Sequence, residues 1–85
     1  MKQEFYIGKE GIVSEEGLAW DLLYYIVLKE GAYSIKVDRV GEDGTLTDET
    51  AGLTDSYNEA EALVKRLMKG SVTPVCLDQV VDRIM

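Results

Sequence analysis

Histidine is absent from this 85-residue sequence, and cysteine, proline and tryptophan each occur only once. Without histidine, the chain lacks the commonest general base and metal ligand, and no Ser-His or Cys-His nucleophile pair can form. The single cysteine, Cys76, excludes an internal disulfide and a cysteine zinc site, which is typical of a reducing compartment. We therefore expect no enzymatic activity, no cofactor and no metal, and we interpret Cys76 as a packing residue.

Long apolar runs are also lacking. The longest, residues 22–28, is far shorter than the roughly 20 residues that span a bilayer. The N-terminal residues do not have the apolar core and small-residue cleavage site of a secretory signal. With 46% hydrophobic and 29% charged residues, the composition is that of a folded globular protein. We expect one domain over residues 1–85, located in the cytoplasm and not bound to a membrane.

Basic residues are missing from one stretch of the chain. Residues 41–64, GEDGTLTDETAGLTDSYNEAEALV, contain seven carboxylates and no lysine or arginine. Acids and bases balance elsewhere, so this stretch accounts for the whole formal net charge of −7. A negative excess argues against direct binding of nucleic acid or an anionic membrane. A positively charged protein surface is compatible with it.

The first third of the chain predicts strands. Residues 4–7 predict a short strand that ends at Gly8 and the polar residues after it, and that resumes at residues 12–13. Residues 18–28 are apolar on both alternating faces and rich in aromatic and β-branched types, which favours a central strand covered on both sides. A buried helix is the alternative for this segment, because periodicity alone does not separate the two over a short apolar run.

Two hairpins follow. Residues 29–32 predict a four-residue connection to a strand over residues 33–38, which alternates apolar and polar side chains. The segment Gly41–Gly44 is the strongest turn signal, because its Asp-Gly step accepts positive φ. The returning strand, residues 45–53, is polar enough to be an edge strand. The residues of the first hairpin that we expect to face the core are Tyr33, Ile35 and Val37.

Helices complete the chain. Ser56 followed by Glu59 predicts a capping box. In this motif, the serine hydroxyl accepts from the backbone N–H of Glu59, and the Glu59 carboxylate accepts from the backbone N–H of Ser56. An apolar stripe then predicts an amphipathic helix over residues 56–69, and a second stripe after Pro74 predicts a short C-terminal helix. The predicted class is α+β: an antiparallel meander of three to four strands, packed by one capped amphipathic helix and a short C-terminal helix.

The C-terminal segment from Val72 to Asp82, VTPVCLDQVVD, resembles the ending of a family of small uncharacterised bacterial proteins, a domain of unknown function. The shared pattern is V-T-P-x-x-L followed by hydrophobic positions, and the likeness extends from about residue 22 to the C-terminus. The resemblance implies a strand pair and a capped helix. It implies no activity and provides no catalytic residues.

The acidic stretch has two interpretations. It lacks the alternating carboxylate order of a calcium loop, so a metal site is not expected there. As a solvated surface, it would only keep an edge strand soluble and complement the positive end of the helix dipole. As a binding surface, it would contact lysines and arginines of a partner. The residues predicted to bind in that case are Glu42, Asp43, Asp48, Glu49, Asp55, Glu59 and Glu61.

Two functional hypotheses follow from these features. The first is a non-enzymatic interaction protein, an acidic inhibitor that mimics nucleic acid and blocks the nucleic-acid-binding groove of a larger basic protein. Small anti-CRISPR proteins of phages and mobile elements are examples of this type. The second is a structural or self-associating domain, a homodimer in which another copy covers the second apolar face of residues 22–28. The aromatic side chains should be mostly core, with one or two as interface anchors: Tyr6, Trp20, Tyr24, Tyr25, Tyr33 and Tyr57.

Overall fold

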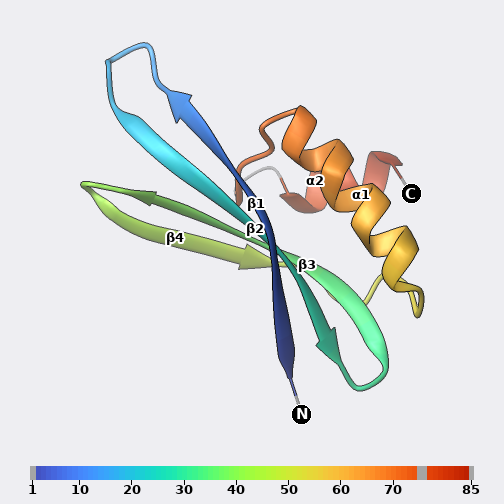
Figure 1. Ribbon diagram of the computed structural model, residues 1–85. Helices are drawn as coiled ribbons and strands as arrows, with labels where there is room; N and C mark the ends of the chain where they lie inside the picture. The colour runs from blue at the N-terminus through green and yellow to red at the C-terminus, as the bar shows by residue number, and fades with distance from the viewer. Residues whose placement is uncertain (1, 75–76, 85) are drawn as a thin grey trace.

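The computed structural model describes residues 2–74 and 77–84. Four antiparallel strands form one sheet in the order β1-β2-β3-β4, and two helices follow them (Figure 1). The α+β class and the meander predicted from the sequence are confirmed, with four strands. Cys76 lies outside the described residues. The elements are β1 (Gln3–Val13), β2 (Ala19–Lys29), β3 (Ala32–Gly41), β4 (Gly44–Glu49), α1 (Tyr57–Lys69) and α2 (Leu77–Ile84).

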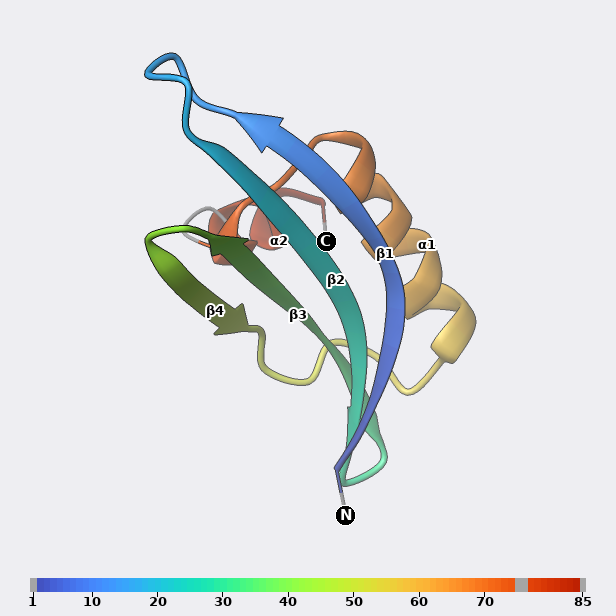
Figure 2. The same ribbon diagram turned by 60° about the vertical axis from the view of Figure 1, so that its left-hand side comes forward.

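The central strand β2 is a strand and not a helix, as its β-branched and aromatic residues favour. Leu22, Tyr24 and Ile26 alternate along one face and are fully buried. Both helices lie on this same face of the sheet (Figure 2). The core therefore sits between one sheet face and α1 and α2, and the helices do not cover both sides of β2.

The opposite face of the sheet is covered by its own long side chains. Val27 is buried there although both helices lie on the other side. The Lys36 ammonium sits 4.7 Å from the centre of the Tyr25 ring and donates to Glu4 at 2.7 Å. This hydrogen bond lowers the pKa of the Glu4 carboxyl. The chain itself thus supplies much of the cover that the sequence led us to expect from a second copy.

Strand β1 differs from the sequence prediction, which ended it at Gly8. It runs without a break from Gln3 to Val13, with a bulge between Tyr6 and Gly8. A β-carbon at Gly8 would overlap the Met68 side chain of α1. Gly8 is therefore a point of close contact between the sheet and α1. The bulge beside it is tolerated because β1 is an edge strand.

One turn and one strand are shorter than predicted. The β2–β3 turn consists of Glu30 and Gly31, both at positive φ, as in the two-residue hairpin turns that fit strand twist. Strand β4 ends at Glu49 and does not reach residue 53. Thr50 causes this end, because its side chain accepts from Ile35 N at 3.1 Å and its own N–H donates to the Ile35 carbonyl at 2.9 Å.

Helix α1 begins after Ser56, whose hydroxyl accepts from Glu59 N at 3.3 Å. The second half of the predicted capping box is wrong. The amide of Ser56 donates to the Thr54 hydroxyl at 3.1 Å, and that hydroxyl donates to the Glu59 carboxylate at 2.6 Å. Backbone bonds to Tyr33 hold Thr54 in place. The Thr54 hydroxyl, and not the Glu59 carboxylate, is therefore the acceptor for the Ser56 amide. The predicted apolar stripe is confirmed: Ala60, Leu63, Val64 and Leu67 are buried.

Tyr24 joins the core to the connection between the helices. Its ring is fully buried, and its hydroxyl donates to the Val72 carbonyl at 2.9 Å. Leu77 and Val81 of α2 belong to the same core cluster. The hydrogen bond fixes the chain just before α2 and so helps to place that helix against the sheet. Neither helix in the described part of the chain is long and apolar enough to cross a membrane.

The phenol of Tyr24 makes stability depend on alkaline pH. Burial, with a smaller contribution from Glu10, raises the pKa of Tyr24 to about 12, above the value of about 10 in an unfolded chain. The neutral phenol therefore stabilises the fold fully below about pH 10, and this contribution is lost as pH rises toward about 12. Tyr24→Phe should lower the free energy of unfolding by about 1 kcal/mol at neutral pH. In urea unfolding, the difference between the two proteins should shrink above pH 10; a constant difference would contradict this role.

Candidate interaction site

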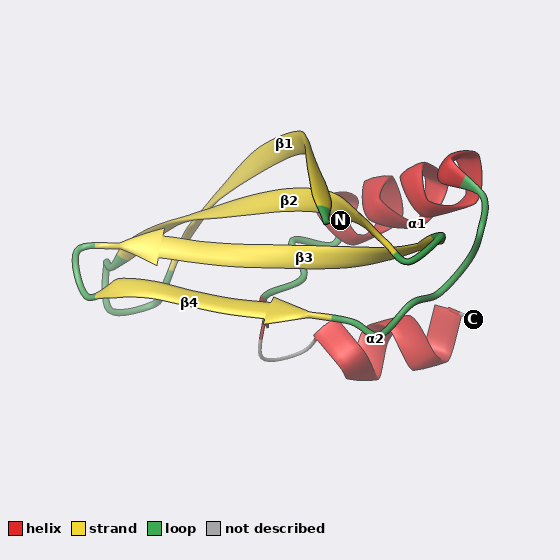
Figure 3. Cartoon of the chain, turned by 90° about the horizontal axis from the view of Figure 1, so that it is seen from below, coloured by secondary structure: helices red, strands yellow, loops and turns green. Residues whose placement is uncertain are grey.

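One end of the sheet projects beyond both helices. The β1–β2 and β3–β4 turns lie at this end, which we call the open end of the sheet (Figure 3). Near this end, one cross-strand row on the helix-facing side consists of Glu10, Leu22, Arg39 and Leu46, which are paired in register. The pairs Ile12–Trp20 and Gly41–Gly44 follow it toward the turns. Leu22 is fully buried, whereas Leu46 is 39% exposed. Leu22 is therefore the last buried residue of β2 toward this end. Beyond the row, Ile12 still packs against the core, whereas Trp20 contacts other residues.

Trp20 is the largest side chain beyond that row. Its indole lies over the backbone of Gly41, where a β-carbon would overlap the ring. The indole N–H donates to Asp43 Oδ1 at 3.0 Å, and the Arg39 guanidinium lies 4.7 Å from the ring centre. A second bond, from Arg39 Nη2 to Asp43 Oδ2 at 3.3 Å, closes the cluster. Asp43 thus uses one carboxylate oxygen for the indole and the other for the guanidinium.

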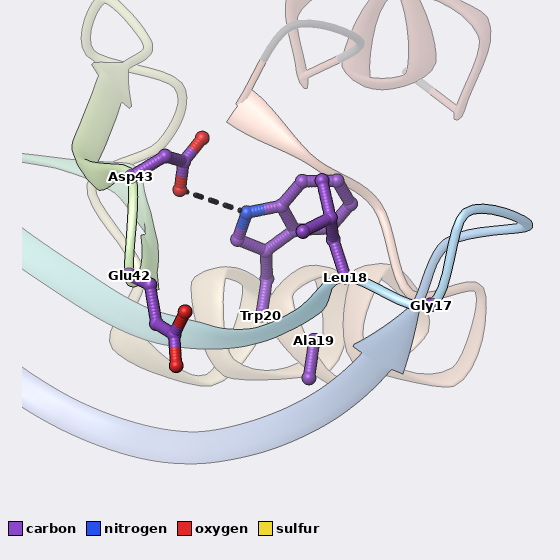
Figure 4. A pocket seen from close by; sticks show the side chains of 6 residues that line it. All are labelled: Gly17, Leu18, Ala19, Trp20, Glu42 and Asp43. Carbon is purple, nitrogen blue, oxygen red and sulfur yellow. Dashed lines mark hydrogen bonds between the residues drawn. The ribbon is translucent and has the colours of Figure 1, made fainter.

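A hollow of about 190 Å³ opens beside the indole (Figure 4). Its apolar wall comes from the end of the β1–β2 turn and the start of β2, and its acidic rim comes from the β3–β4 turn. Leu18 is 48% exposed and Glu42 is also exposed, so a ligand can reach both sides. The lining residues are Gly17, Leu18, Ala19, Trp20, Glu42 and Asp43.

The turn that carries Leu18 is held by its own hydrogen bonds. Leu18 N donates to the Ser14 hydroxyl at 3.1 Å, and Ser14 N donates to the Leu18 carbonyl at 2.8 Å. Gly17 supplies the positive φ of 83° that closes the turn, a conformation that residues with a β-carbon rarely adopt. The apolar wall of the hollow is therefore fixed before any ligand arrives.

The seven carboxylates predicted to bind a partner do not form one surface. Glu42 and Asp43 lie on the hollow. Asp48 and Glu49 are neighbours in β4 and point to opposite faces; Asp48 accepts from Glu49 N at 2.9 Å, and Glu49 pairs with Lys2 at 3.1 Å. The remaining three, Asp55, Glu59 and Glu61, lie at the start of α1.

The two outer groups of carboxylates are separated by the length of β3. The start of α1 follows Thr54, which is paired with Tyr33, whereas the hollow lies just beyond Gly41. Eight residue steps of a strand span roughly 25 Å. Two members of the helix group also have partners within the chain, because Glu59 binds Thr54 and Glu61 lies 3.6 Å from Lys65. Their contact with a partner protein stays a prediction.

Sequence reasoning missed the residues that surround the two acids of the hollow. Trp20 was expected to be mostly core, and neither Leu18 nor Arg39 was singled out. Asp43, Arg39 and Trp20 come together only through the pairing of β2 with β3. The signal in the sequence was weak: a lone tryptophan between a turn glycine and a charged residue. Across the described residues, no cluster of three or more potential ligands fits a metal ion.

A protein-family model matches nearly the whole chain. The model of DUF6514, a family of unknown function, matches residues 3–85. The resemblance seen in the C-terminal pattern is thereby confirmed, and it covers nearly the whole chain. No curated protein and no solved structure matches the sequence.

Gly41→Ala tests whether the glycine seats the indole. The added β-carbon would displace the ring of Trp20 and break its bond to Asp43. We expect the free energy of unfolding to fall by about 1–3 kcal/mol, as in other overpacked sites, and the indole N–H resonance to move toward that of exposed tryptophan. Gly11→Ala is the control, because a β-carbon there meets only Asp21 at 4.0 Å. Equal effects of the two substitutions would contradict this role of Gly41.

Proposed function

The chain belongs to the DUF6514 family, which is of unknown function, and we propose from its own surface that it is a non-catalytic protein-interaction domain. It binds a positively charged segment of a larger protein at the open end of the sheet. The observation that carries this proposal is the hollow in which an indole and a half-exposed leucine meet an acidic turn.

The composition of the open end supports binding more than simple solvation. Tryptophan and arginine are the residue types enriched where binding energy concentrates, and such residues sit in apolar centres with polar rims. Here Trp20 and Leu18 form the centre, and Glu42 and Asp43 form the rim. A solvated strand end needs no exposed leucine and no glycine seat for an indole. The absence of histidine from the sequence supports a role without catalysis.

The acidic inhibitor expected from the sequence is a special case of this proposal. A mimic of nucleic acid presents its charges as a continuous row that follows the groove of the partner. The carboxylates of this chain fall into separate groups, with Asp48 and Glu49 on opposite faces of one strand. This arrangement favours a local docking site over an extended mimic. Competition between the domain and nucleic acid for a captured partner would support the special case.

Matched charge reversals at the two ends of the sheet test the proposal. Glu42 and Asp55 are both exposed, and each substitution by lysine changes the net charge equally. A partner is first captured on the immobilised chain, identified by mass spectrometry and purified. Glu42→Lys should then raise the Kd by about tenfold because it faces the basic segment, whereas Asp55→Lys should change it by less than about twofold. The Kd of the parent chain should rise with salt.

The pattern of losses separates the interpretations. A loss with Glu42→Lys alone locates the partner at the open end. Equal losses with both substitutions would show that only the net charge matters, and would contradict a local site. An unchanged Kd in both variants would show that neither Glu42 nor Asp55 contacts the partner, and the acidic stretch would then be only a solvated surface.

Self-association is the second candidate function, and one exposed aromatic side chain favours it. Tyr6 on the edge strand β1 is 57% exposed and packs edge-on against Tyr25 with ring centres 5.6 Å apart. A homodimer that buries this pair predicts a species of twice the 9.5 kDa chain mass in sedimentation at micromolar concentration. Tyr6→Lys should return that species to a monomer, since it would bury an unpaired charge. A 9.5 kDa species of the parent chain would reject self-association.

A further inference from the structure

We propose that the hollow at the open end binds one lysine side chain of the partner segment; this inference rests on the proposed function and names the chemistry of its contact. A lysine side chain has an apolar part and a charged part, which require different surroundings. Its methylene stem requires an apolar wall, and its ammonium requires an anion at the rim. The hollow offers both within about 190 Å³.

The apolar wall suits the stem of a lysine. Leu18, Ala19 and Trp20 line the hollow with apolar atoms. The wall is preformed, because Ser14 holds the turn and Gly41 seats the indole. A preformed site avoids the entropic cost of ordering side chains on binding.

The anion at the rim is Glu42. Both oxygens of Asp43 already accept hydrogen bonds, one from the Trp20 indole and one from Arg39. Among the described residues, Glu42 has neither a hydrogen bond nor an ion pair from its side chain. It is therefore the carboxylate that an incoming cation can neutralise without breaking an existing contact.

Arg39 argues for lysine rather than arginine as the occupant. A guanidinium gains most from stacking on an aromatic face while it binds a carboxylate in a planar fork. The guanidinium of Arg39 already stacks on Trp20 and bonds to Asp43. A second guanidinium would face a ring whose stacking position is filled. An ammonium is a compact point charge that needs only Glu42 and the edge of the hollow.

The single tryptophan makes the hollow directly observable. The complete chain is titrated with three capped pentapeptides, Gly-Gly-X-Gly-Gly, in which X is lysine, norleucine or arginine. Binding is followed by tryptophan fluorescence and by the NMR resonance of the indole N–H. The lysine peptide should bind about two- to fivefold more tightly than the norleucine peptide, and more tightly than the arginine peptide. Equal binding of lysine and norleucine peptides overturns the proposal, and so does tighter binding of arginine.

Two isosteric variants show whether the contact is local. Glu42→Gln should reduce the affinity for the lysine peptide to that of the norleucine peptide. Glu30→Gln, in the β2–β3 turn at the other end of the sheet, removes the same charge from an exposed turn and should leave the affinity unchanged. An equal loss in both variants would show non-specific attraction to an acidic chain and overturns the inference.

The outcomes also separate this inference from the proposed function. If the purified partner depends on Glu42 but the lysine peptide does not bind, the lysine contact is wrong and the interaction site stands. If the lysine peptide binds but the partner affinity does not change in Glu42→Lys, the hollow is a lysine site and the proposed partner site is wrong.

Discussion

The length of α1 relative to the strands is the constraint on which the rest of the molecule depends. Its 13 residues make a helix about 20 Å long, whereas the 11 residues of β2 extend about 36 Å. One such helix, with α2 beside it, covers only part of a sheet face. The remaining part keeps its side-chain alternation but has no helix above it among the described elements. The cluster of Trp20, Arg39 and Asp43, the hollow and the acidic turn all lie in this remainder.

The open end is stabilised by contacts that do not need a helix. The β-branched and aliphatic residues of the core give way there to an indole, a guanidinium and a carboxylate, each bonded to the next. A cation–π contact at a partly exposed site contributes about 0.5–1 kcal/mol, which is small beside the burial of Leu22 and Tyr24. The cluster therefore orders its own residues without being required for the fold.

The sequence predicted those features that depend on neighbours along the chain. The strand type of β2, the alternation of β3 and the apolar stripe of α1 are local patterns, and all are confirmed. Features that depend on distant residues were missed. The contact of Gly8 with Met68 involves a residue of α1, and the end of β4 depends on a bond between Thr50 and Ile35. The acidic stretch was recognised as a unit because it is continuous in sequence, but a turn, a strand and a helix start divide it in space.

That division gives the carboxylates different electrostatic roles. Charges roughly 25 Å from the hollow, by strand length, lie beyond the screening length of about 8 Å at physiological ionic strength. Asp55 and its neighbours at the start of α1 therefore contribute little to the energy of a segment bound at the open end. In the proposed complex, they would add instead to the negative field that a basic partner meets during diffusion, which affects the rate of association. In the proposed complex, Glu42 at the rim of the hollow would lie within the screening length of the bound cation, so it would contribute to the affinity as well as to the rate of association.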